Sequence, residues 1–129
     1  MLRPALAIHL ALLIATASGV VAAQVQRVFP QNALRGALVI GNPPEATLNG
    51  DPARLAPGVR IRGTSNMLAM SGTLTGGRLL VNYTLDTSGL IKDVWILTPE
   101  EADRRPWPTT QKQADEWLFD PIAQTWTRP

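Results

Sequence analysis

The carboxylates and arginines of residues 100–105 form the densest group of reactive side chains in this 129-residue chain. Glu100, Glu101 and Asp103 precede Arg104 and Arg105. A pair of carboxylates can act as general acid and base in glycoside hydrolysis. Acids in the first turn and arginines in the last turn also complement the dipole of a single short helix. We favour the capped helix, and a carboxylate-dependent hydrolase at Glu100 or Glu101 remains an alternative.

Other catalytic side chains are scarce. The chain has no cysteine, and its one histidine, His9, lies in an N-terminal segment with the features of an export signal. Beyond that segment the usual nucleophile, base and zinc-ligand arrangements are therefore missing. Neither a calcium-type acidic loop nor a phosphate-binding glycine motif is present. We expect a protein that is not an enzyme and that uses no metal or cofactor.

Residues 1–23 have the three parts of a secretory signal peptide. Arg3 supplies the positive start, an almost uninterrupted apolar run follows, and Val21 and Ala23 fit the small-x-small pattern of a cleavage site. An uncleaved anchor is the alternative, because the segment has about the 20 residues of a membrane-spanning helix. We expect cleavage near Ala23 and a periplasmic protein.

Cleavage would leave residues 24–129 as one small domain, with residues 24–35 as a lead-in segment. Without Arg3, 11 of the 12 basic residues remain against 10 acidic ones. These charges are spread along the sequence with no basic run, so we expect no nucleic-acid partner. We expect contact with a membrane only if the signal is retained, and the sequence leaves the oligomeric state open.

Short apolar runs between glycines and prolines predict β-structure. The sequence predicts a buried strand at 37–40, a hairpin turn at Asn49-Gly50, and a second turn at Pro57-Gly58. It also predicts an alternating strand at 59–62, paired with 67–70 unless that run is a helical turn. Residues 79–85 and 90–97 predict a long hairpin whose second strand is central in its sheet.

The last third of the chain carries two signals for helix starts. Thr98 with Glu101 forms a capping box, and Thr110 with Gln113 forms another. The fold class predicted from all these elements is α+β. It consists of a small antiparallel β-sheet or open barrel with one or two short C-terminal helices.

Four tryptophans stand in the last 35 residues. Trp95 and Trp117 occur in apolar periodic contexts and are assigned to the core. Trp107 is flanked by prolines that hold it in an extended segment, and Trp126 follows near the C-terminus. We therefore select Trp107, Arg104, Arg105 and Trp126 as candidate binding residues, because tryptophan combines contact area with a polar edge.

The hairpin at 80–97 resembles that of TonB C-terminal domains. Leu80–Asp86 followed by Gly89–Leu97 has their strand, Asp-x-x-Gly turn and valine-rich second strand. Ala114, Trp117, Phe119 and Pro121 are similar to the family's helix end and aromatic tail. The resemblance covers about a third of residues 24–129 and implies a domain that binds a peptide by adding a strand to its sheet edge. The chain otherwise has the general look of short exported proteobacterial proteins.

These observations lead to one main hypothesis and one further alternative to the hydrolase. We expect a non-enzymatic periplasmic domain that binds a protein or peptide partner, through a sheet edge or around Trp107. The alternative is a carbohydrate or cell-wall binding module that uses exposed aromatic side chains.

Overall fold

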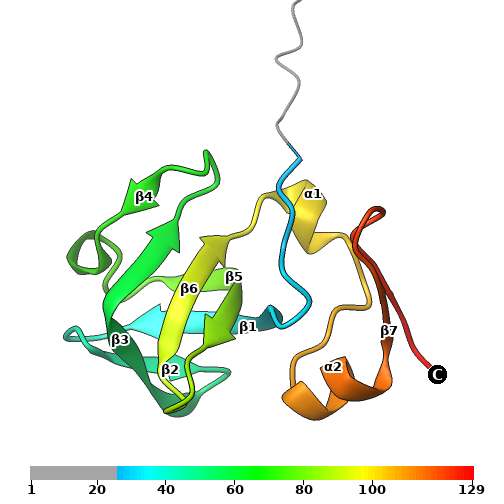
Figure 1. The fold of residues 1–129 in the computed structure, drawn as a ribbon. Coiled ribbons are helices and arrows are strands. Elements are labelled where there is room, and N and C mark those ends of the chain that lie inside the picture. The colour runs from blue at the N-terminus through cyan, green and yellow to red at the C-terminus, as the bar shows by residue number, and fades with distance from the viewer. Residues whose placement is uncertain (1–25) are drawn as a thin grey trace, which may run out of the picture.

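A closed barrel of five strands is the centre of the fold. The computed structural model describes residues 26–129, and the predicted signal peptide with its cleavage site lies outside the described residues. Each barrel strand pairs with two neighbours, and the pairing of β2 with β3 completes the circle. In chain order the barrel strands are β1 (Leu34–Ile40), β2 (Glu45–Leu48), β3 (Asp51–Arg62), β5 (Arg78–Leu85) and β6 (Ile91–Ile96) (Figure 1).

One long strand, β3, makes this closure possible. Its first half pairs antiparallel with β2, and its second half pairs parallel with β6. Pro57 and Gly58 lie inside the strand, where the register with β6 shifts between Leu55 and Arg60. Gly58 has a φ of +74°. Proline and glycine at such a shift bend a strand, so that one strand can face two partners.

The predicted fold class is therefore wrong. In place of an α+β fold with an antiparallel sheet or open barrel, the domain is mostly β, with 44% strand, 12% helix and a closed barrel. The error arises at Pro57-Gly58, which has the composition of a turn but bends a continuous strand. The parallel pairing of β3 with β6 joins segments far apart in the sequence, and no local pattern indicates it.

The strand order around the barrel is β1-β2-β3-β6-β5, with β3 and β6 parallel. This five-stranded Greek-key arrangement has the topology of the OB-fold. Many functions share such a fold, so the topology alone assigns no ligand.

The turn at Asn49-Gly50 and the long hairpin agree with the sequence predictions, whereas the turn predicted at Pro57-Gly58 is part of β3. Asn49 and Gly50 join β2 to β3 with φ values of 52° and 85°, as a tight hairpin turn requires. β5 and β6 form the predicted hairpin, and β6 lies between β5 and β3. The carboxylate of Asp86 accepts two backbone N–H bonds in the turn between them.

Beyond the barrel, β4 (Leu68–Ala69) extends the sheet past β3. Ile61 and Arg62 of β3 lie opposite Ala69 and Leu68, so the strand interpretation of 67–70 is confirmed over the helical one. A 3₁₀ turn, η1 (Ser71–Thr73), follows. β4 is consequently a short outer strand with β3 on one side.

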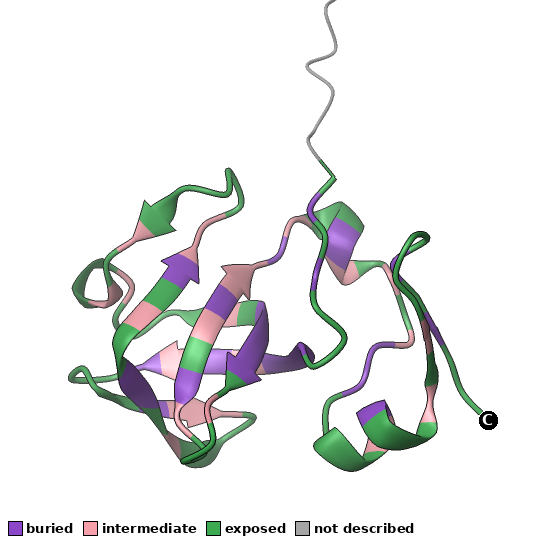
Figure 2. Ribbon diagram, in the orientation of Figure 1, coloured by how far each residue is buried: buried purple, intermediate pink, exposed green. Residues whose placement is uncertain are grey.

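The C-terminal third packs beside the barrel and shares its core (Figures 1 and 2). The capping box of Thr98 and Glu101 is present. Thr110 also caps its helix, but the side chain of Gln113 accepts from the N–H of Thr109 instead of completing a second box. The elements here are α1 (Pro99–Ala102), α2 (Gln111–Glu116), β7 (Leu118–Asp120) and β8 (Thr125–Thr127).

Candidate functional site

One row of side chains crosses the outer face of five adjacent strands. The strand registers place its members directly opposite one another from β4 to β1. On the barrel strands, chain neighbours such as Ile61 and Val94 are buried in the core, so the row members on these strands face outward. Leu68 shares that face because it lies directly opposite Arg62. We call this row the outer row, and its members in order are Leu68, Arg62, Trp95, Asn82 and Arg35.

We call the end of the outer row at Arg35 and Asn82 the covered end, because it lies beneath the C-terminal segment. Both residues are buried. The guanidinium of Arg35 lies 4.8 Å from the ring centroid of Trp107. It donates to Asn82 Oδ1 at 3.1 Å, to the carbonyl of Glu101 at 3.0 Å and to that of Arg104 at 2.7 Å. Arg35 therefore donates to carbonyls at the end of α1 and just beyond it, one of which, that of Glu101, also accepts from the N–H of Arg104.

The charge of Arg35 survives this burial. Burial lowers the pKa of Arg35 to about 10, with a raising effect from Glu101 and further lowering from Arg104 and Arg105. The side chain is therefore still a cation near neutral pH. It also stacks on Trp107, so cation and ring together hold α1 and the following segment against the barrel.

Glu101, one of the two carboxylates of the hydrolase alternative, is part of this same attachment. Its side chain forms a buried ion pair with Arg27 and accepts from the N–H of Thr98. Burial alone would raise the pKa of Glu101, but the bonds from Arg27 and Thr98 lower it below its usual value. Glu101 is thus an ionised anchor with its acceptor sites occupied, and Glu100 beside it is exposed.

The four candidate binding residues do not form one accessible surface. Trp107 and Trp126 are only 5% and 4% exposed. Their rings meet edge to face with centroids 6.1 Å apart, and Trp107 Nε1 donates to the carbonyl of Ala33. Arg104 is half-buried and Arg105 is exposed. The sequence left the exposure of Trp107 open, and the structure buries it beside the start of β1, where the N–H of Arg35 donates to the carbonyl of Pro108.

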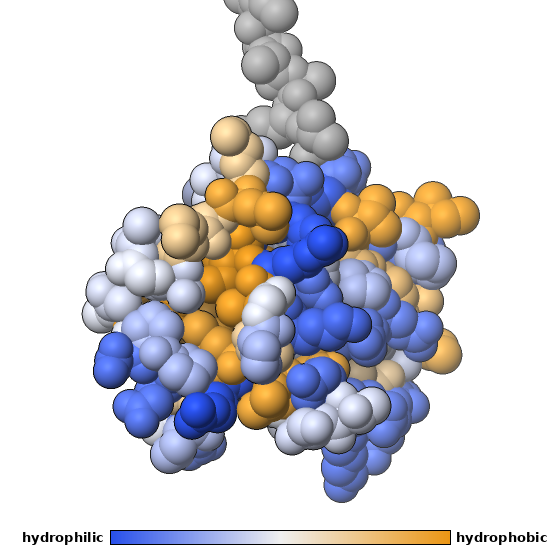
Figure 3. All heavy atoms as spheres, turned by 60° about the vertical axis from the view of Figure 1, so that its left-hand side comes forward, coloured by the Kyte–Doolittle hydropathy of each residue, from blue (hydrophilic) through white to orange (hydrophobic). Residues whose placement is uncertain are grey.

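The other end of the outer row, at Arg62 and Leu68, is the open end. Met67, Leu68 and Met70 are 72%, 68% and 78% exposed, three large apolar side chains within four residues. In Figure 3, which brings this side of the molecule forward, apolar surface forms a band between hydrophilic regions. Such contiguous exposed apolar surface is typical of an interaction site.

The backbone of β4 is also open. The N–H of Gly63 donates to the carbonyl of Met67, which makes Gly63 and Met67 a hydrogen-bonded pair. In an antiparallel ladder such pairs alternate with non-bonded ones. Arg62 and Leu68 are the next pair. The N–H and C=O of Leu68 therefore point away from β3, toward the free edge of the sheet.

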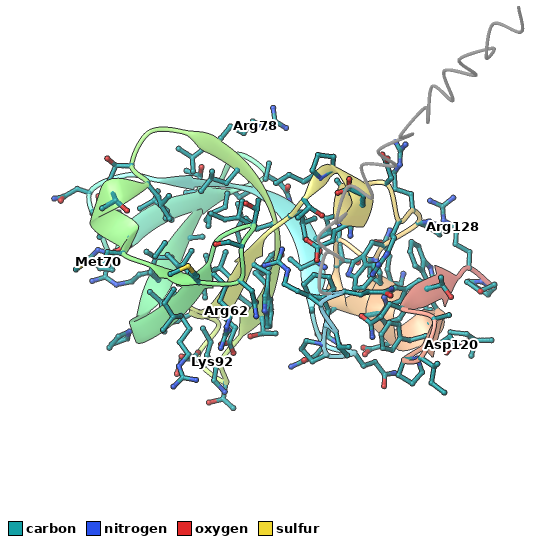
Figure 4. All side chains as sticks on the ribbon, turned by 90° about the horizontal axis from the view of Figure 1, so that it is seen from above. Arg62, Met70, Arg78, Lys92, Asp120 and Arg128 are labelled. Atoms are coloured by element: carbon teal, nitrogen blue, oxygen red, sulfur yellow. The ribbon has the colours of Figure 1, made fainter. Side chains whose placement is uncertain are left out.

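Basic side chains lie one and two strands inside this edge. Arg60 and Lys92 are exposed, and the side chain of Arg62 is 24% exposed. Figure 4 shows Arg62 and Lys92 on the same side of the barrel, with Arg78 on the opposite side. In the described part of the chain, Asp93 is the carboxylate that pairs with these basic side chains, 3.8 Å from Arg62.

Two hollows are also present on the described part of the surface. The larger, about 840 Å³, lies between α1 and the turn at 64–66, and the smaller, about 430 Å³, lies over β1 and β2. Both open to solvent. Among residues 26–129, no cluster of histidine and carboxylate side chains could hold a metal ion. No helix in that range is long and apolar enough to cross a membrane.

Comparisons with protein-family models, with curated proteins and with solved structures found no match. The resemblance to TonB C-terminal domains therefore stays a prediction. Its hairpin corresponds to β5 and β6, and both strands have partners on each side within the barrel. Strand addition at that hairpin would need the barrel to open, whereas β4 already has a free side.

Proposed function

We propose that this domain binds a protein or peptide partner by strand addition at β4, without catalysing a reaction. The observation that carries the proposal is the free edge of Leu68, whose outward backbone groups lie among the exposed side chains of Met67, Leu68 and Met70. An added strand would pair with those backbone groups and cover those side chains. If the predicted signal peptide is cleaved, the partner is a periplasmic protein.

Natural sheets usually protect an exposed edge with charge, proline, a covering element or a very short edge strand. β4 is short, and the carbonyl of Met70 accepts from the N–H and hydroxyl of Thr73. Residues 67–70 nevertheless contain no charge or proline, and the exposed apolar side chains beside the outward groups of Leu68 would favour aggregation if they had no partner. This supports a binding role for the edge. The burial of Trp107 and Trp126, by contrast, leaves the carbohydrate alternative without the aromatic platform on which it depends.

The test uses two substitutions at one position. Leu68→Pro removes the outward N–H, and edge strands tolerate proline where the N–H faces solvent. Leu68→Ala removes the side chain and keeps the N–H. Peptides are selected from a random displayed library on the wild-type protein. They should bind Leu68→Pro at least tenfold more weakly than the wild type, about 1.4 kcal/mol. The loss of affinity for Leu68→Ala should be smaller. Selected peptides that bind Leu68→Pro as well as they bind the wild type would contradict strand addition.

A further inference from the structure

We infer that the strand added at β4 carries glutamate side chains that pair with Arg60 and Arg62. This inference rests on the proposed function and names the chemistry of the partner. It comes from the order of residues across the sheet, in which an apolar row on β4 lies beside a basic row on β3.

The register of β3 and β4 fixes this order. Leu68 lies directly opposite Arg62. Met70 has extended backbone angles, and the same register continued by one pair sets it opposite Arg60. Leu68 and Met70 therefore border the free edge on the outer face, with one arginine behind each.

The spacing of strands decides which acidic side chain fits. An added strand would lie two strands from β3, about 10 Å away. Arg60 has no ion-pair partner among residues 26–129 and can extend across Met70 to meet a glutamate from the added strand. The side chain of Arg62 lies toward Trp95 and Asp93 on β6, so it must turn from them to meet a glutamate across Leu68. An aspartate on the added strand is one methylene shorter than a glutamate. Alternating side chains share a face, so the partner pattern is glutamate at every second position with apolar residues between.

The charge on this face is not balanced within the described chain. Arg60 and Lys92 are exposed, and neither has an ion-pair partner among residues 26–129. Asp93 is the nearest opposing carboxylate, and it is shared between Arg62 at 3.8 Å and the hydroxyl of Thr84 at 3.2 Å. Two more carboxylates on an added strand would complement the remaining positive charge.

An anionic membrane is the competing partner for an apolar edge beside basic side chains. The backbone argues against it. The outward N–H and C=O of Leu68 would have no hydrogen-bond partner in hydrocarbon, and each unsatisfied group there costs several kcal/mol. A peptide strand can accept from the N–H and donate to the C=O of Leu68. It can also contact the apolar side chains of β4 and the arginines of β3, so we favour a peptide over a membrane.

The experiment uses three capped octapeptides that alternate valine with glutamate, serine or lysine. Binding to the labelled protein is followed by titration and by hydrogen exchange of the Leu68 amide. We expect all three to slow that exchange, because each forms the strand. The glutamate peptide should bind about tenfold more tightly than the serine peptide, and the lysine peptide most weakly. This preference should shrink at high salt.

The double variant Arg60→Gln with Arg62→Gln should remove the preference for glutamate while the Leu68 amide stays protected by all three peptides. The matched control is Arg54→Gln with Arg78→Gln, which removes the same charge. Arg78 lies on the opposite side of the barrel (Figure 4), and Arg54 is paired across from Glu45 on the first half of β3. The control should keep the preference.

Four outcomes separate the two claims. Equal binding of all three peptides with slowed exchange at Leu68 would overturn the acidic partner and leave strand addition standing. Unchanged Leu68 exchange with every peptide would overturn the proposed function. Glutamate-peptide binding that survives Leu68→Pro at full strength would overturn both. Binding to phosphatidylglycerol vesicles that displaces the glutamate peptide and survives Leu68→Pro would assign the edge to a membrane.

Discussion

The two ends of the outer row carry the same pair of residue types in different surroundings. At the covered end Arg35 lies 4.8 Å from the ring of Trp107, and at the open end Arg62 lies 5.7 Å from the ring of Trp95. Arg35 is buried and donates to several acceptors across the chain. Among residues 26–129, the one ion-pair partner of Arg62 is Asp93, at 3.8 Å.

This difference shows that residue type does not decide which arginine is available to a partner. The C-terminal segment covers one end of the row and uses its cation to hold α1. Nothing in the described chain covers the other end, so its cation, its apolar neighbours and its backbone edge stay accessible. The comparison predicts that substitutions at the covered end reduce stability, while those at the open end change binding.

The largest expected effect is the loss of stability when the Trp107 ring at the covered end is removed. Trp107→Ala should lower the free energy of unfolding by about 3–5 kcal/mol, because Trp107 contacts Phe29, Phe119 and Trp126 in the core. Trp95→Ala should cost about 1–2 kcal/mol, since that ring is half-buried. Urea unfolding followed by far-UV circular dichroism measures both. Equal losses would show that the two ends do not differ.

How much of the fold the sequence predicts depends on how far apart along the chain the interacting residues are. The turn at Asn49-Gly50, the β5–β6 hairpin and the capping box of Glu101 depend on neighbouring residues, and the sequence predicts them correctly. Barrel closure depends on a parallel pairing between distant strands, and the sequence gives no signal for it.

The binding residues were harder to predict for the same reason. The proline-rich segment around Trp107 has the composition of an exposed segment. Trp107 is buried because this segment lies beside the start of β1. Arg35 contacts carbonyls 66 and 69 residues away. The cluster at Met67, Leu68 and Met70 was predicted as a strand, but its exposure follows from the position of β4 at the end of the sheet.

The second prediction compares the two arginines directly. Arg35→Met keeps much of the side-chain volume and removes every hydrogen bond, so buried carbonyls of Glu101 and Arg104 lose a donor. We expect a loss of about 2–3 kcal/mol in the free energy of unfolding. Arg62→Met should change it by less than about 1 kcal/mol, as for other ion pairs with solvent access. The same unfolding measurement applies, and a larger loss for Arg62→Met than for Arg35→Met would reverse the assignment of the two ends.

The smallest expected effect is a difference in the dependence of stability on pH. The ion pair of Arg27 with Glu101 lowers the pKa of Glu101 in the folded protein below its usual value of 4.5. Above that value the carboxyl is ionised in both the folded and the unfolded states, and the pair contributes fully. As the pH falls below about 4.5, the unfolded chain takes up the proton first, and this contribution declines until the folded carboxyl is protonated as well.

Glu101→Gln should therefore lower stability at neutral pH and flatten part of its decline in acid, as measured by urea midpoints over a pH series. Asp93→Asn at the open end should lower stability at neutral pH by less than Glu101→Gln, because its ion pair with Arg62 is long and has solvent access. A larger loss for Asp93→Asn than for Glu101→Gln would mean that the open end, and not the covered one, contains the pair on which folding depends.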